Sequence, residues 1–294
     1  MAARPDRRRY PSATTAASAL FVLAVFGLLH RFGAGGTGNT AFGDGRFRIW
    51  AAVATVSLLV WVLLFQRGVG EIRALSGPWR RSRRWWAGNL AAYAVLGVLT
   101  AVAIGLVVSG GSASVPIRHF SEIVDGLTAL GWCAAGPWIL MVWMGHERVR
   151  DLAVATAAVG APAPGREDDP VALIARGAVE IRERVERSAL ALAVLGSTSV
   201  LTTGALRCSL VDAEAVAAED FSSWWILGYG ALFSVVVAAV VFPLLFAWRA
   251  QALGLVDRAP GSRTVGALRI RRPLSVLSVL APLATSVPTA FLVP

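Results

Sequence analysis

The sequence contains no lysine, only two cysteines and few charged residues of any kind. Its 28 basic residues are all arginine, and charged residues form 16% of the chain, whereas a soluble globular domain carries about 25%. Cys133 and Cys208 lie far apart, in no ligand-like spacing, so neither a disulfide framework nor a structural zinc site is indicated. The shortage of charge in a chain of 294 residues needs an explanation other than a soluble core.

Long hydrophobic runs take the place of charge. Hydrophobic residues form 56% of the chain, with a mean hydropathy of +0.62, and they gather in runs of roughly 18–25 residues, the length that crosses a bilayer as a helix. We therefore expect an all-α, polytopic integral membrane protein, in which residues 1–294 form one helical membrane domain with about seven transmembrane helices. The expected spans are residues 12–30, 49–65, 88–108, 126–145, 189–206, 224–247 and 273–293, the last of which contains Pro282 and Pro288.

The positions of the charged residues support these spans. Every arginine, aspartate and glutamate lies outside the seven segments, as expected because a charge at the centre of a bilayer costs at least ~2.5 kcal/mol. Alternate connections place 23 arginines on one side and five on the other, and the positive-inside rule makes the arginine-rich side cytoplasmic. The pattern predicts a plasma-membrane protein with a cytoplasmic amino terminus and an extracellular carboxyl terminus.

The connection between the fourth and fifth spans, residues 146–188, is the longest and has a regular pattern. Asp169-Pro170 is a helix start signal, and no proline follows before the fifth span, which predicts one continuous helix from about Pro170 to Arg207. We expect a cytoplasmic helical hairpin here. Apolar residues recur along its second arm at steps of three and four: Val171, Ile174, Ala178, Ile181 and Val185.

This apolar stripe has three possible roles. It packs within the hairpin, binds a protein partner as a coiled coil, or lies on the membrane surface, although the eight acids of residues 146–188 make anionic lipid a poor partner. The stripe covers only about two heptads, fewer than a convincing coiled coil needs. Its length therefore favours packing within the hairpin.

Hydroxyl groups are the main polar groups inside the predicted spans. Those that suggest a polar path lie in the fifth and seventh spans: Ser197, Ser199, Thr202, Thr203, Thr285 and Ser286. Such hydroxyls usually bond to their own or a neighbouring helix, so helix packing is the simpler interpretation and a substrate path is the alternative. The spans contain no carboxylate, which disfavours transport coupled to protons or ions.

No catalytic, cofactor-binding or metal-binding signature occurs in the sequence. The glycine-rich residues 33–45 lack the lysine of a P-loop, and GxSxG and HExxH motifs are absent. His119, Glu122 and Asp125 suit zinc by residue type, but the sequence places them in a short solvated connection, so we expect no metal site. The net charge of +10 is explained by arginines that meet anionic lipid rather than nucleic acid, since no basic soluble module is present.

These observations favour a non-enzymatic plasma-membrane protein of a bacterium with a GC-rich genome, a source suggested by the all-arginine usage. Its expected partners are the lipid bilayer and a protein bound by the hairpin and the arginine-rich loops. One alternative is a small transporter or channel lined by the hydroxyls of spans five and seven. Another is an enzyme that acts on lipid through His119 with Glu122, or His146 with Glu147.

Overall fold

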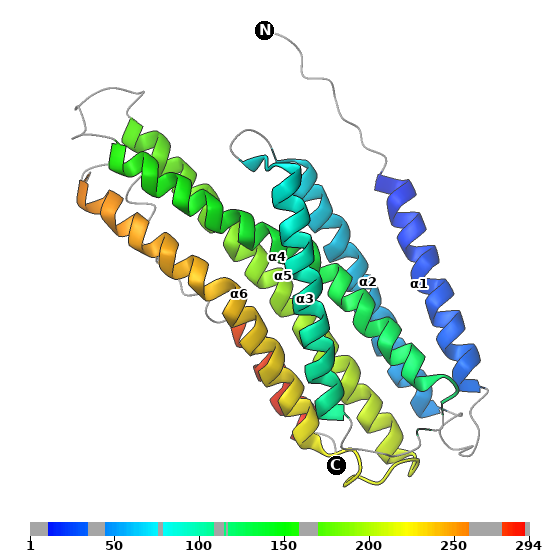
Figure 1. The fold of residues 1–294 in the computed structure, drawn as a ribbon. Helices are drawn as coiled ribbons and strands as arrows, with labels where there is room; N and C mark the ends of the chain where they lie inside the picture. Colours follow the sequence, from blue (N-terminus) through cyan, green and yellow to red (C-terminus); the bar gives the residue numbers. More distant parts are fainter. Residues whose placement is uncertain are drawn as a thin grey trace.

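The computed structural model describes residues 11–34, 45–75, 79–108, 115, 117–158, 170–258 and 278–291. Within these ranges the chain is all-helical and has no strand, which confirms the expected fold class. The helices run side by side in an elongated bundle (Figure 1). They are α1 (Pro11–Ala34), α2 (Phe47–Arg73), α3 (Arg83–Val108), α4 (Phe120–Ala158), α5 (Pro170–Asp212), α6 (Ser223–Arg258) and α9 (Ala281–Phe291).

Five of these helices are long and apolar enough to cross a membrane: α2, α3, α4, α5 and α6. This finding supports the membrane class that the hydropathy predicts. The apolar part of α1, Ala16–Arg31, is shorter. Helix α9 has 11 residues, or about 16 Å. The rest of the predicted seventh span, residues 273–277 and 292–293, lies outside the described residues, so the count of seven remains a prediction.

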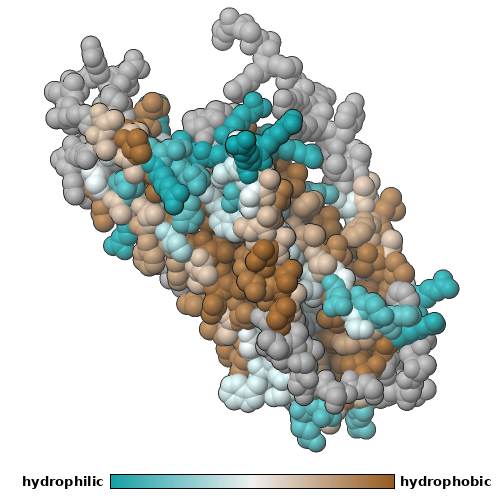
Figure 2. Space-filling model, in the orientation of Figure 1, coloured by the Kyte–Doolittle hydropathy of each residue, from teal (hydrophilic) through white to brown (hydrophobic). Residues whose placement is uncertain are grey.

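The surroundings of these segments explain why they are helical. Helix α6 carries Val235-Val236-Val237 and Val240-Val241, and β-branched residues lower helix propensity in water. In hydrocarbon every backbone N–H and C=O must be paired within the segment. Figure 2 shows a broad apolar area over the middle of one face, with hydrophilic residues gathered toward the ends. The helical state of such sequences is therefore set by the apolar medium more than by intrinsic propensity.

Helices α4 and α5 form the centre of the bundle. Of their most apolar windows 56% is buried inside the protein, against 6% for α3. Helix α5 contacts α2, α4, α6 and α9, and it begins at Pro170, as its start signal predicts. At 43 residues it is about 65 Å long, twice the ~30 Å of a bilayer core. In Figure 1, α4, α5 and α6 run on together past the ends of α2 and α3.

The predicted apolar stripe lies where these long helices pack together. The side chains of Ile174, Ala178, Ile181 and Val185 are all buried in the main core. Trp248 of α6 covers the same face, since its indole N–H donates to the carbonyl of Ala178 at 2.7 Å. The side chain of Val171 lies outside the described residues. The described stripe is thus occupied by the chain's own helices, and binding of a partner there remains a prediction.

Close approach between helices depends on glycine at defined points. A Cβ added to Gly68 of α2 would lie 2.7 Å from the Cβ of Pro137 in α4. On the other side of the bundle, Gly230 of α6 faces Ser286 of α9, and an added Cβ would lie 2.8 Å from the carbonyl oxygen of Pro282. Small residues at helix interfaces allow such contacts in membrane proteins. These glycines therefore allow α2 to pack closely against α4, and α6 to pack closely against α9.

Candidate binding cavity

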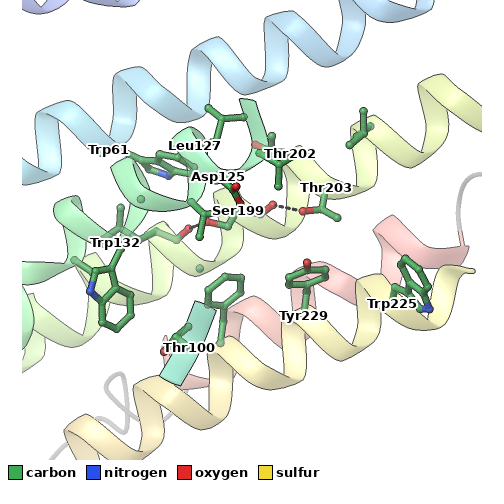
Figure 3. Close-up of a pocket in the computed structure, with 18 of the residues that line it drawn as sticks. Trp61, Thr100, Asp125, Leu127, Trp132, Ser199, Thr202, Thr203, Trp225 and Tyr229 are labelled. Atoms are coloured by element: carbon green, nitrogen blue, oxygen red, sulfur yellow. Dashed lines mark hydrogen bonds between the residues drawn. The ribbon is translucent and has the colours of Figure 1, made fainter. Parts of the chain in front are cut away.

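A cavity of about 480 Å³ lies among α2, α3, α4, α5 and α6. This volume falls within the range of small-molecule sites, about 300–1,000 Å³. It is placed near the end of the bundle where α2 and α4 begin and α5 ends, because Trp50, Phe120 and Leu206 all line it. Figure 3 shows side chains from several of these helices around one common space.

Aromatic side chains form much of the cavity wall. Trp61 comes from α2, Trp132 from α4, and Trp225 and Tyr229 from α6. Trp61 is held in place because its indole N–H donates to the Thr198 hydroxyl of α5 at 2.8 Å. Trp132 is stacked on the ring of Tyr93, with ring centroids 5.0 Å apart. Neighbouring side chains therefore fix two of these rings, as expected of a preformed site.

Trp50 lies in the cavity wall with its indole nitrogen enclosed by protein atoms. The residue lines the cavity and is 1% exposed, and its Nε1 is buried with no hydrogen-bond partner within the described part of the chain. A buried donor left unpaired costs roughly 1–3 kcal/mol. Because the nitrogen itself is buried, Trp50 contributes apolar ring surface to the cavity.

Three hydroxyls of the predicted polar path line the cavity. These are Ser199, Thr202 and Thr203, which lie within about one turn of each other on α5. Their hydrogens are engaged within the protein: Ser199 donates to the Leu195 carbonyl at 2.9 Å, and Thr203 donates to the Ser199 carbonyl at 3.1 Å. Thr202 lies 2.9 Å from both the Thr198 carbonyl and the Ser57 hydroxyl. The oxygens are left with lone pairs, so the row acts mainly as hydrogen-bond acceptors.

The other three residues of the predicted path are placed elsewhere. Ser197, Thr285 and Ser286 are not among the residues that line the cavity. Thr285 donates to the carbonyl of Ala281 at 2.8 Å, and the fully buried Ser286 donates to the carbonyl of Leu283 at 2.7 Å. In α9 these hydroxyls thus satisfy their own helix. A polar path through the seventh segment remains a prediction.

Two carboxylates lie on the cavity wall: Asp125 of α4 and Asp220 of the connection before α6. Both residues are exposed, and neither makes an ion pair within the described residues. Neither was predicted as part of a binding site, because in the sequence both lie in connections between the expected spans. Helix α4 begins at Phe120, so Asp125, Thr128 and Trp132 share one face at i, i+3 and i+7.

The zinc ligands considered from the sequence do not come together. His119 and Glu122 form an exposed pair at 3.5 Å, whereas Asp125 lines the cavity. In the part of the chain that the structure describes, no group of three or more His, Cys, Asp or Glu residues is placed to hold a metal ion. Glu147, the candidate partner of His146, instead pairs with Arg150 at 3.6 Å.

A charged network lies at the opposite end of the bundle. Glu71 of α2 accepts from Arg187 of α5 at 2.7 Å and also faces Arg184 at 3.8 Å. The Arg184 guanidinium in turn lies 4.7 Å from the ring centroid of Trp79. Arg148 of α4 approaches the same ring, at 5.7 Å. This network joins α2, α4 and α5 beyond the apolar part of the bundle.

No histidine, cysteine or arginine occurs among the described residues that line the cavity. It combines aromatic surface, hydroxyl acceptors and two carboxylates. Comparison with family models, curated proteins and solved structures found no match for this chain.

Proposed function

We propose that this chain is a membrane protein that binds an amphipathic small molecule in the cavity among α2–α6. The observation that carries the proposal is the cavity itself, about 480 Å³ in volume and walled by aromatic rings beside a row of hydroxyls. Small-molecule sites are typically concave and mostly apolar, with a few placed polar groups. Because the five helices around it are apolar, a molecule with a hydrocarbon part can reach it from the bilayer.

The topology that accompanies this proposal has seven spans in the plasma membrane, with a cytoplasmic amino terminus and a cytoplasmic hairpin formed by α4 and α5. The support is the arginine asymmetry of the connections and the length of α4 and α5, which exceeds the bilayer core. In this orientation the cavity lies toward the extracellular side, with Asp125 and Asp220 at that end. A reporter fused to the carboxyl terminus tests the topology, and a cytoplasmic signal contradicts it.

The test of cavity binding uses two tryptophan substitutions on α5. Thr203→Trp fills the cavity, whereas Leu201→Trp places the same side chain on the exposed side of the helix, where Leu201 is 43% exposed. The proteins are reconstituted in phosphatidylcholine nanodiscs and titrated with radiolabelled glycerol monolaurate, an uncharged single-chain amphipath. Saturable binding is expected for the wild type and Leu201→Trp, and Thr203→Trp should bind about tenfold more weakly or not at all. Equal binding by all three proteins, or partitioning without saturation, contradicts the proposal.

Transport of the bound molecule is a natural extension, because Thr202 and Thr203 both line the cavity. The double substitution Thr202→Val and Thr203→Val removes two hydroxyls with little change in volume. It should change the rate at which glycerol monolaurate crosses the membrane of proteoliposomes. If wild-type vesicles move it no faster than protein-free vesicles, the protein binds the molecule without transporting it.

A second candidate function is that of a membrane partner acting through the extension of α4 and α5. The observation that favours it is two exposed apolar side chains on this extension, Val154 at 72% and Leu173 at 71%. Deleting residues 146–188 would remove part of the main core, including Ile181, so surface changes are the sharper test. Val154→Glu with Leu173→Glu should abolish recovery of a specific partner in a pull-down, and unchanged recovery contradicts this function.

A further inference from the structure

The cavity differs in charge from the rest of the chain. The protein carries a formal net charge of +10, yet the described cavity lining holds two aspartates and no basic residue. Arg207 approaches the lining at Phe221, but its Nε donates to the Phe221 carbonyl at 2.7 Å. Within the described residues Arg207 forms no ion pair with Asp125 or Asp220. The formal charge of the cavity wall is therefore negative.

The neutral polar groups of the wall include both acceptors and donors. The hydroxyl hydrogens of Ser199, Thr203 and Thr100 all go to carbonyls of their own helices, so their oxygens offer acceptors to an occupant. The lining also contains donors, namely the indole N–H groups of Trp132 and Trp225 and the hydroxyl of Tyr229. The preference for a positively charged occupant therefore rests on the carboxylates and on the aromatic faces.

Aromatic rings share the cavity wall with the carboxylates. Phe221 follows Asp220 in sequence, and its ring lies 5.7 Å from that of Trp225, centroid to centroid. Both rings line the cavity, as does Tyr229 one turn further along α6. The face of an aromatic ring attracts an ammonium group, most strongly for tryptophan. Rings beside a carboxylate are a combination that binds alkylammonium groups.

From these features, and resting on the proposed function, we infer that the ligand of the cavity is a cationic amphipath. Its ammonium head lies near Asp125 and Asp220 among the aromatic rings. Its hydrocarbon part lies deeper, against Leu192, Leu195 and Val237 of α5 and α6. An anionic head would meet two carboxylates and no cation of the lining.

Two esters of the same shape and opposite charge test this inference. Lauroylcholine and lauroyl isethionate share the chain and the ester and differ in a trimethylammonium against a sulfonate group. Both are titrated into wild-type protein in nanodiscs of zwitterionic phosphatidylcholine, with the Thr203→Trp protein as the lipid background. Lauroylcholine should bind about tenfold more tightly than lauroyl isethionate, since each ion pair or ring contact contributes modestly.

Substitution of Asp125 and Asp220 tests whether these two carboxylates cause the preference for lauroylcholine. Asp125→Asn with Asp220→Asn keeps the side-chain size and should lower the ratio of the two affinities about threefold or more, with glycerol monolaurate unaffected. Each single variant should show a smaller decrease in the same direction. The matched control, Asp212→Asn with Glu219→Gln, removes two exposed acids that do not line the cavity and should keep the wild-type ratio.

The outcomes separate the inference from the function beneath it. Equal binding of the two esters by the wild type, or an unchanged ratio in the Asp125/Asp220 variant, overturns the cationic ligand while glycerol monolaurate binding still supports the cavity. A ratio that falls equally in the control variant also overturns it, because the effect is then the general field of that end of the protein. Absence of saturable binding for all three amphipaths contradicts the proposed function itself.

Discussion

Trp61 of α2 and Thr198 of α5 are joined by a hydrogen bond of 2.8 Å, in which the indole N–H donates to the threonine hydroxyl. The Thr198 hydroxyl also lies 2.8 Å from the carbonyl of Val194, and the hydroxyl of Ser57 approaches the Thr198 carbonyl at 3.4 Å. Trp61 lines the cavity, so these hydrogen bonds between α2 and α5 also fix one wall of the cavity.

The first prediction concerns the hydrogen bond between Trp61 and Thr198. Thr198→Val and Trp61→Phe should each lower thermal stability in detergent, and the double variant should reveal a coupling of about 0.5–1.5 kcal/mol, the size of a hydrogen bond between membrane helices. Thr55→Val is the control, because the Thr55 hydroxyl donates to its own helix at the carbonyl of Ala51. Additive effects of the two changes would show that the bond contributes nothing.

The second prediction concerns the packing of α9 against α6. Gly230→Ala should destabilise the protein by about 1–3 kcal/mol, because the new methyl group overlaps Ser286 and presses on the Pro282 carbonyl. Gly228→Ala, half a turn away, meets nothing within 4 Å and should be neutral or slightly stabilising, since alanine favours helix. Thermal unfolding followed by circular dichroism compares the two. Equal effects would mean that α9 does not pack on α6 as described.

The third prediction concerns the charged network opposite the cavity. Glu71→Gln should cost about 1–3 kcal/mol, between the values for surface and buried pairs, because the Glu71 side chain is only 21% exposed and faces two arginines. Glu180→Gln breaks an i,i+4 pair with Arg184 and should cost about 0.5 kcal/mol or less. Raising the salt concentration should shrink the smaller effect more than the larger one. If Glu180→Gln cost more stability than Glu71→Gln, the Glu71 carboxylate would be solvated rather than paired with the arginines.

The fourth prediction concerns the apolar stripe. Ile181 is fully buried in the main core, so Ile181→Ala should destabilise the isolated protein by about 2–5 kcal/mol. Leu173→Ala, at an exposed position two residues from Val171, should change stability by no more than about 0.5 kcal/mol. Thermal unfolding of the purified protein is the measurement. A stripe that serves only a partner would give an Ile181→Ala variant of unchanged stability.

The sequence alone predicts the helices well and the cavity poorly, and the reason is physical. Bilayer length and charge exclusion place an apolar helix along the chain, and the Asp169-Pro170 start signal predicts the beginning of α5 at Pro170. Those rules do not say how a helix is rotated about its axis. Ser199 and Thr203 were singled out, but nothing in the sequence distinguishes them from Ser197, which is not part of the cavity lining.

Asp125 shows why the carboxylates of the candidate site were missed. Excluding charge from predicted spans is a sound rule for the centre of a bilayer, and it leaves Asp125 in the connection just before the expected fourth span. Near the end of a helix a carboxylate reaches the polar interface, so the helix begins at Phe120 and includes it. The cavity also takes residues from five helices, and pairings across such distances in the chain leave no local pattern to detect.

Helix α3 has a mechanical consequence for the cavity. It supplies Thr100 to the wall, and Gly97 gives Trp132 room, since an added Cβ would lie 2.5 Å from its indole nitrogen. Yet only 6% of its apolar window is buried against protein. In the proposed membrane orientation, acyl chains cover the rest of α3 and hold this wall in place. Under the proposed function, the lateral pressure and the thickness of the bilayer therefore affect the binding equilibrium, and the membrane acts as a component of the site.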